Sequence, residues 1–163
     1  MTSTRLRPPR NPVDRRAVGW WRTNLLLLTA VPIVPLVVLG LLISPARFWL
    51  LAPAVVIAVL GLVAVVALPR WWFRVHRWEV TETAVYTRTG RIWQEWRVAP
   101  LSRIQTVDTR RGPLEQRFGL ATVVVTTASA KGAVTMPALD HALAEDIAEQ
   151  LTVKTQAVAG DAT

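Results

Sequence analysis

Two long uncharged runs constrain this sequence more than any other feature. Residues 25–43 form a run of 19 without a charged side chain, and residues 48–68 form a second run of 21. As α-helices, runs of these lengths extend about 28 and 32 Å, which matches the hydrocarbon core of a bilayer. Only residues 44–47 separate them, so the pattern predicts a tight transmembrane hairpin with spans at 25–43 and 48–68.

Aromatic residues gather at the ends of both runs, where the two interfaces of a membrane favour Trp and Tyr. Seven of the 12 aromatic side chains lie in these positions, and arginines accompany them after the second run. We therefore expect a set of membrane-interface residues, which comprises Trp20, Trp21, Trp49, Arg70, Trp71, Trp72 and Arg74.

The positions of the charges predict the orientation of the hairpin. The 163-residue chain has a formal net charge of +8, with six Arg in residues 1–24, three in residues 70–77 and only Arg47 between the runs. The positive-inside rule then places both termini in the cytoplasm and makes the chain a multi-pass protein of the plasma membrane. A cleaved signal peptide is the rival interpretation, since Ser44-Pro45-Ala46 resembles a cleavage site. A signal core is shorter, however, and here a second apolar run follows at once.

Several classes of function are disfavoured by what the sequence lacks. The two runs contain no ionisable residue, Asn or Gln, so they resemble an anchor rather than a transporter. The chain has no Cys and two His, and we expect no metal, no cofactor and no enzymatic activity. Residues 78–163 hold nine basic and ten acidic residues, which argues against nucleic-acid binding. In the second run, Ala54, Ala58 and Gly61 form a ridge suited to packing against the first helix or another copy.

The residues after the hairpin predict short strands followed by one helix, an α+β pattern. Alternation and turn residues predict strands at 75–81, 84–89, 91–98, 101–109, 122–127 and 133–136. The three-residue spacing of Ile104 and Val107 indicates a bulge or bend. Asp140 is expected to cap a helix whose Leu143, Ile147 and Leu151 recur every four residues.

Three sequence segments resemble the bacterial pleckstrin-homology (PH) domain family. They are Leu101-Ser-Arg-Ile-Gln-Thr-Val-Asp108, Gly112-Pro-Leu114 and Arg117-Phe-Gly-Leu-Ala-Thr122. The two preceding helices make the chain most similar to the membrane-anchored, YdbS-like branch. The resemblance implies a PH-like split β-barrel of seven strands, capped by the C-terminal helix, and the strands predicted above account for six. The resulting organisation is an Arg-rich cytoplasmic tail (1–24), the hairpin (25–68), the PH-like domain (70–153) and a disordered tail (154–163).

One group of side chains is a candidate contact for a partner or a lipid. It comprises Arg88, Arg91, Trp93, Arg97, Arg110 and Arg111. An exposed Trp among arginines suits a peptide, a partner domain or a lipid headgroup. Alternatively, Trp93 covers a barrel end or packs toward the membrane.

We expect a non-enzymatic adaptor that binds a protein partner or self-associates. A module that senses anionic lipid or envelope stress is the alternative, since the arginines beside the membrane suit contact with anionic lipid. A third possibility is a subunit of a larger membrane complex in which the hairpin itself is the contact.

Overall fold

A computed structural model describes residues 9–90, 93–129 and 132–160 of the chain. The described residues divide into two compact units. Residues 18–71 form one unit, called the hairpin below, and the described residues up to Ala17 join those from Trp72 onward to form the other, called the domain. The domain is therefore built from segments that lie on both sides of the hairpin in the sequence.

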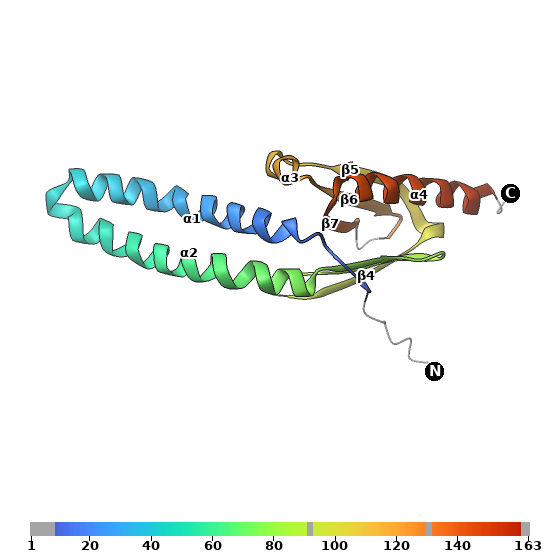
Figure 1. The fold of residues 1–163 in the computed structure, drawn as a ribbon, viewed down its shortest axis with the longest axis horizontal. Helices are drawn as coiled ribbons and strands as arrows, with labels where there is room; N and C mark the ends of the chain where they lie inside the picture. The colour runs from blue at the N-terminus through green and yellow to red at the C-terminus, as the bar shows by residue number, and fades with distance from the viewer. Residues whose placement is uncertain (1–8, 91–92, 130–131, 161–163) are drawn as a thin grey trace, which may run out of the picture. The chain divides into compact units, whose positions relative to one another are not determined.

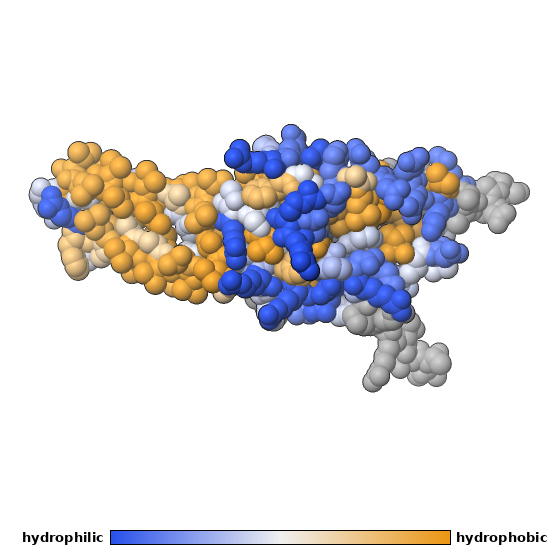
Figure 2. Space-filling model, viewed as in Figure 1, coloured by the Kyte–Doolittle hydropathy of each residue, from blue (hydrophilic) through white to orange (hydrophobic). Residues whose placement is uncertain are grey.

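The predicted transmembrane hairpin consists of helices α1 (Arg16–Leu42) and α2 (Arg47–Val75), joined by a 3₁₀ turn at Ser44–Ala46 (Figure 1). Both helices are long and apolar enough to cross a membrane. They extend beyond the predicted spans because the uncharged runs mark only the part that hydrocarbon must surround. Figure 2 shows hydrophobic residues over most of the visible face of both helices, and such a surface requires an apolar environment.

Two glycines allow the helices of the hairpin to approach closely. A Cβ atom at Gly61 would lie 2.5 Å from Cγ2 of Thr29, and one at Gly40 would lie 2.9 Å from Cδ2 of Leu51. Ala54 is also buried, whereas Ala58 is exposed. The ridge expected from sequence is thus confirmed at Ala54 and Gly61 only. These two residues are seven positions apart, which is about two helical turns, so they lie on the same side of α2.

Among its described residues, the domain contains two antiparallel sheets that do not close into one hydrogen-bonded barrel. The first has the order β1-β2-β3-β4, with strands Asn11–Pro12, Arg77–Val80, Ala84–Thr89 and Glu95–Pro100. The second has the order β5-β6-β7, with strands Ile104–Arg110, Leu120–Thr127 and Val134–Asp140. This arrangement confirms the predicted α+β class, and the register shift between Ile104 and Thr106 confirms the predicted bulge.

The strand that the sequence left unassigned comes from the segment before the hairpin. In β1, Asn11 pairs with Trp78 and Pro12 pairs with Arg77. The indole Nε1 of Trp78 donates to the Pro12 carbonyl at 3.1 Å, and the Arg10 amide donates to the Glu79 carboxylate at 3.2 Å. These residues lie in the segment expected to be an Arg-rich tail, and the structure makes them part of the domain.

Helix α4 (His141–Gly160) contacts all three strands of the second sheet (Figure 1). Within residues 141–156 of this helix, Ala144, Ile147 and Leu151 are buried, whereas Leu143 is 39% exposed. The sequence predicted that Leu143 shares the buried face of this helix, and the structure corrects that prediction. The buried face begins at Ala144 and continues at positions three and seven residues later, and Leu143 is rotated from Ala144 by about 100° around the helix axis. The helix also continues through residues 154–160, where the sequence predicted a disordered tail.

A short helix, α3 (Pro113–Phe118), was not predicted; it begins at the expected Gly112-Pro113 turn. Proline suits the first helical position because that residue needs no amide donor. Glu115 is buried, and its carboxylate accepts hydrogen bonds from the Gly112 amide at 2.7 Å and from the Thr122 hydroxyl at 2.8 Å. Six residues are too few for a helical period to be visible in the sequence.

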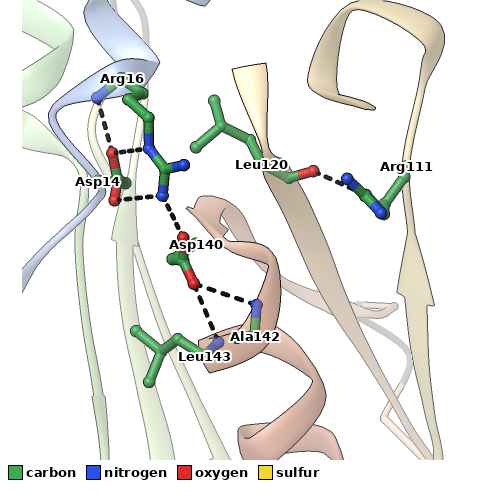
Figure 3. A network of polar contacts seen from close by, with 7 residues as sticks. All are labelled: Asp14, Arg16, Arg111, Leu120, Asp140, Ala142 and Leu143. Carbon is green, nitrogen blue, oxygen red and sulfur yellow. Dashed lines mark hydrogen bonds and ion pairs between the residues drawn. The ribbon is translucent and has the colours of Figure 1, made fainter. Parts of the chain in front are cut away.

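An ion-pair network ties the first residue of α1 to the first turn of α4 (Figure 3). The Arg16 guanidinium donates to Asp14 at 3.0 and 3.2 Å and also to Asp140. Asp140 in turn accepts the amides of Ala142 and Leu143 at 3.1 and 3.4 Å, which caps α4 as predicted. One side chain therefore connects two distant parts of the sequence inside the domain.

Gly119, which belongs to the family-like segment, provides the space for this network. It ends α3 with φ 65°, a left-handed conformation that favours glycine. A Cβ atom at this position would lie 2.7 Å from Nη1 of Arg16. The Gly119 carbonyl also accepts the His141 amide at 3.1 Å, so the same residue connects the end of α3 to the start of α4.

The hydrogen bonds from Arg16 lower the pKa of Asp14 and the pKa of Asp140 below their ordinary value of 3.8. Partial burial opposes this effect at both carboxyl groups, but the bonds to the guanidinium are the larger cause. Carboxyl groups with a lowered pKa in the folded state stabilise the fold above their unfolded pKa. That contribution is lost as the pH falls through the lowered values.

We predict that Gly61→Val destabilises the hairpin by about 1–3 kcal/mol because the new side chain overlaps Thr29. Thermal unfolding of the full chain in detergent measures the effect. Ala58→Val is the matched control, since Ala58 lies on the same helix and is exposed. Thr29→Ala removes the clashing Cγ2 and should restore part of the loss. Equal destabilisation by the two valine variants would contradict the close approach.

We predict that Arg16→Gln lowers the stability of the domain at pH 7 by about 1 kcal/mol, the magnitude of a surface network. The Arg16 side chain is 47% exposed, which limits the effect. The difference between wild type and variant should shrink below about pH 4, since the unfolded chain then binds protons that the two ion-paired carboxylates take up only at lower pH. Urea unfolding followed by Trp fluorescence at pH 7 and pH 3 measures it.

A matched pair of variants separates the ion pair from the helix cap. Asn caps a helix as well as Asp does, so Asp140→Asn should lose only the bond to Arg16. Asp140→Ala should lose both the bond and the cap and should be the less stable variant. If wild type exceeds Arg16→Gln in stability by the same amount at pH 3 as at pH 7, the ion-pair network is contradicted.

Candidate functional site

The outer face of β4 carries an exposed apolar surface. Register pairs Arg88 of β3 with Trp96, and the Arg88 guanidinium lies over the Trp96 ring at 5.3 Å from its centroid. This distance suits a cation–π interaction. Trp96 is 38% exposed and Val98, two residues further on the same face, is 40% exposed. Trp93, in the segment before β4, is 87% exposed.

Arg97 lies on the opposite face of β4, because successive side chains of a strand alternate. Its Nε donates to Glu95 Oε1 at 2.7 Å, and its Nη1 donates to the Ala133 carbonyl at 2.7 Å. Ala99, on this same face, is buried. Arg97 thus links the first sheet to the segment that leads into β7.

The predicted contact residues are divided among separate parts of the domain. Arg88 and Trp93 belong to the exposed side of the β3–β4 region, whereas Arg97 is on the inner face. Arg110 is exposed at the end of β5, and Arg111 follows it and donates to the Leu120 carbonyl at 3.1 Å (Figure 3). Arg91 lies outside the described residues.

Trp96 is the residue of this surface that the sequence analysis did not select. Alternation predicted a strand over residues 91–98, but it did not tell which of the two faces of that strand is exposed. The contact residues predicted from sequence include Arg97, which in β4 lies on the face opposite Trp96 and Val98. Ala99 could have identified the inner face from the sequence. It lies on the same face as Arg97 and is small and buried, as expected for a position where the two sheets pack closely together.

The residues expected at the membrane interface differ in exposure. Trp49, Arg70, Trp71 and Arg74 are exposed, and Trp20 is half-buried. Trp21 and Trp72 are buried, so their rings face protein rather than solvent or lipid.

A cleft of about 700 Å³ lies beside β4. Four consecutive residues of β4 line it, which means that it follows the edge of the strand and not only one face. Its other wall comes from the end of β6 and the start of β7; together the lining residues are Glu95, Trp96, Arg97, Val98, Thr127, Ser129, Gly132 and Val134. The ion pair of Glu95 with Arg97 keeps this lining nearly neutral.

The cleft and the exposed surface provide main-chain groups, hydroxyls and aromatic rings for contact with another molecule. Within the described residues, no group of three or more His, Cys, Asp or Glu is placed to hold a metal ion. The two histidines are engaged elsewhere: Nδ1 of His76 lies 2.8 Å from the Trp72 carbonyl, and His141 lies 3.4 Å from Glu145.

Comparisons with known proteins agree with this architecture. Residues 23–155 match the bacterial PH domain family. The chain is also similar to the UPF0699 transmembrane protein YdbS of Bacillus subtilis (strain 168), with 26% identity over 147 residues that cover 88% of this chain and 91% of the relative. A search of solved structures found no significant match.

The family match begins inside α1 and ends inside α4, so it includes both apolar helices and the strands from β2 to β7. The short strand β1 precedes it and belongs to the same domain. The resemblance noted in the sequence is thereby confirmed. The chain belongs to the bacterial PH domain family, as a membrane-associated member.

Proposed function

We propose that this chain is a membrane-anchored, non-enzymatic interaction module whose PH-like domain faces the cytoplasm and binds protein. The observation that carries the proposal is the exposed surface of Trp93, Trp96 and Val98 beside the cleft along β4. Aromatic side chains that remain in water are preferred anchors for a partner. The hairpin, whose apolar runs lack ionisable residues, serves as the anchor.

The charges around the cleft favour a protein over an anionic lipid headgroup. Arg97 is bonded to Glu95 and to the Ala133 carbonyl, so part of its five N–H donors is engaged and its charge is offset by a neighbouring carboxylate. Arg88 is stacked on Trp96. A phosphate would meet the Glu95 carboxylate beside these cations, whereas a peptide can use the apolar and main-chain groups without that repulsion.

The pairing of β1 with β2 supports an orientation with both ends of the hairpin on one side of the membrane. These strands flank the hairpin in sequence and are hydrogen-bonded to each other. The excess of arginine at the same two ends favours the cytoplasmic side.

We predict that Ser44→Cys reacts with a membrane-impermeant maleimide in intact cells, because the turn Ser44–Ala46 then lies outside. Thr109→Cys, exposed on β5, should react only after the cells are permeabilised. The chain has no cysteine of its own, so each label reports one position. The reverse pattern of labelling would contradict the cytoplasmic placement of the domain.

We predict that a photo-crosslinking amino acid at position 93 of the full chain captures protein in living cells. The adduct should weaken with Trp96→Ala, which removes the neighbouring anchor but leaves the main chain of β4 in place, and should be unchanged with Trp71→Ala, which removes an exposed Trp of the hairpin. Position 116, exposed on α3, provides the background. Adducts to lipid alone would favour the lipid-sensing alternative, and identical adducts from positions 93 and 116 would contradict a site at β4.

A further inference from the structure

Strand β4 is an edge strand whose outward main-chain groups can be assigned. The Leu101 amide donates to the Thr83 carbonyl at 2.9 Å, one step beyond the register pair of Ala84 with Pro100. Hydrogen-bonded pairs alternate along an antiparallel ladder, and no register shift interrupts this one. The main-chain groups of Glu95, Arg97 and Ala99 therefore point toward β3, and those of Trp96, Val98 and Pro100 point away from it.

The outward groups are available for pairing. Among the described residues, β4 is hydrogen-bonded to β3 alone, and no bond beyond that ladder reaches the main chain of Trp96 or Val98. Pro100 has no amide, which is the residue type expected on the outer side of an edge strand. A row of unpaired amides and carbonyls is a template for another strand, and the cleft leaves this edge accessible.

The side chains around Trp96 are self-complementary. In an antiparallel pairing of β4 with β4 of a second copy, centred on Trp96, each Trp96 lies opposite its counterpart. Glu95 of each copy then lies opposite Arg97 of the other, so two pairs of opposite charge form. Gln94 lies opposite Val98, and the two tryptophans form a cross-strand aromatic pair beside their Arg88 partners.

We infer that two copies of this chain associate through antiparallel pairing of their β4 edges, centred on Trp96. The inference rests on the proposed function, since it names a second copy as the protein that binds at this site. Anchoring confines the copies to one membrane, which raises their effective concentration. A contact formed mainly by main-chain pairing is then sufficient for association.

Single cysteines test the register, because the chain has no Cys of its own. Trp96→Cys places two thiols on directly opposed residues, whose Cα atoms are about 5.5 Å apart and within disulfide reach. Val98→Cys is the matched control: it is on the same face and similarly exposed, but the register separates the two copies of position 98 by about 13 Å. Mild oxidation of the full chain in membrane vesicles should give a disulfide dimer with Trp96→Cys.

Val98→Cys should give only the background measured with Gln116→Cys, an exposed position on α3. A tenfold increase in the ratio of lipid to protein should leave the dimer of Trp96→Cys in place and reduce collisional crosslinks. Equal crosslinking from positions 96 and 98, or a lack of crosslinking above background from position 96, would overturn the register.

A charge reversal provides a test that retains Trp96. Glu95→Arg places arginines opposite each other, and Arg97→Glu places glutamates opposite each other, so each variant alone should lose at least about fivefold in co-purification of two differently tagged copies. Co-expression of the two variants restores opposite charges at both positions and should restore co-purification. A misfolded variant cannot produce this rescue.

No loss in either single variant, or no rescue in the mixture, would overturn the inference. The same experiments distinguish a failure of self-association from a failure of the proposed protein-binding function. If position 93 captures a different protein while Trp96→Cys gives no dimer, the module binds another partner and only self-association fails. If position 93 captures lipid alone, both fail.

Discussion

The pairing of β1 with β2 is the interaction on which the rest of the structure depends. It joins Asn11 and Pro12 to Trp78 and Arg77, so two segments separated by the whole hairpin become neighbours in one sheet. The transmembrane hairpin is in effect an insertion between the first two strands of the domain. Such a domain forms only when both ends of the hairpin emerge on the same side of the membrane.

The Arg16 network extends this constraint from the sheet to the helices. The Asp14 amide donates to the Ala138 carbonyl at 3.0 Å, and Ala138 has φ 57°, an uncommon conformation for a residue with a side chain. It lies where the register between β6 and β7 shifts, so a bulge in β7 presents the carbonyl to the segment before α1. Arg16 then reaches Asp140 through the space that Gly119 leaves open.

The features that sequence reasoning recovered are those with a long or regular signal. The uncharged runs predicted both helices of the hairpin, and the limits of β3 were predicted correctly at 84–89. Asp140 was identified as a cap because one residue type performs that role before an apolar period. By contrast, β1 has two residues, one of them proline, and its pairing partner lies beyond the hairpin. No local pattern can reveal such a strand, since its stability comes entirely from tertiary contacts.

The candidate site was recovered in part for a related physical reason. Alternation assigns the residues of a strand to two faces, but which face is outward depends on where the second sheet packs. Charge is a poor guide to this choice in β4, because Arg97 satisfies its donors with Glu95 and a carbonyl while Trp96 remains half in water. The net charge of the chain lies mainly in the segments that flank the hairpin in the sequence. At the edge of β4, the recognition that we propose therefore depends on main-chain pairing and aromatic contact rather than on a long-range field.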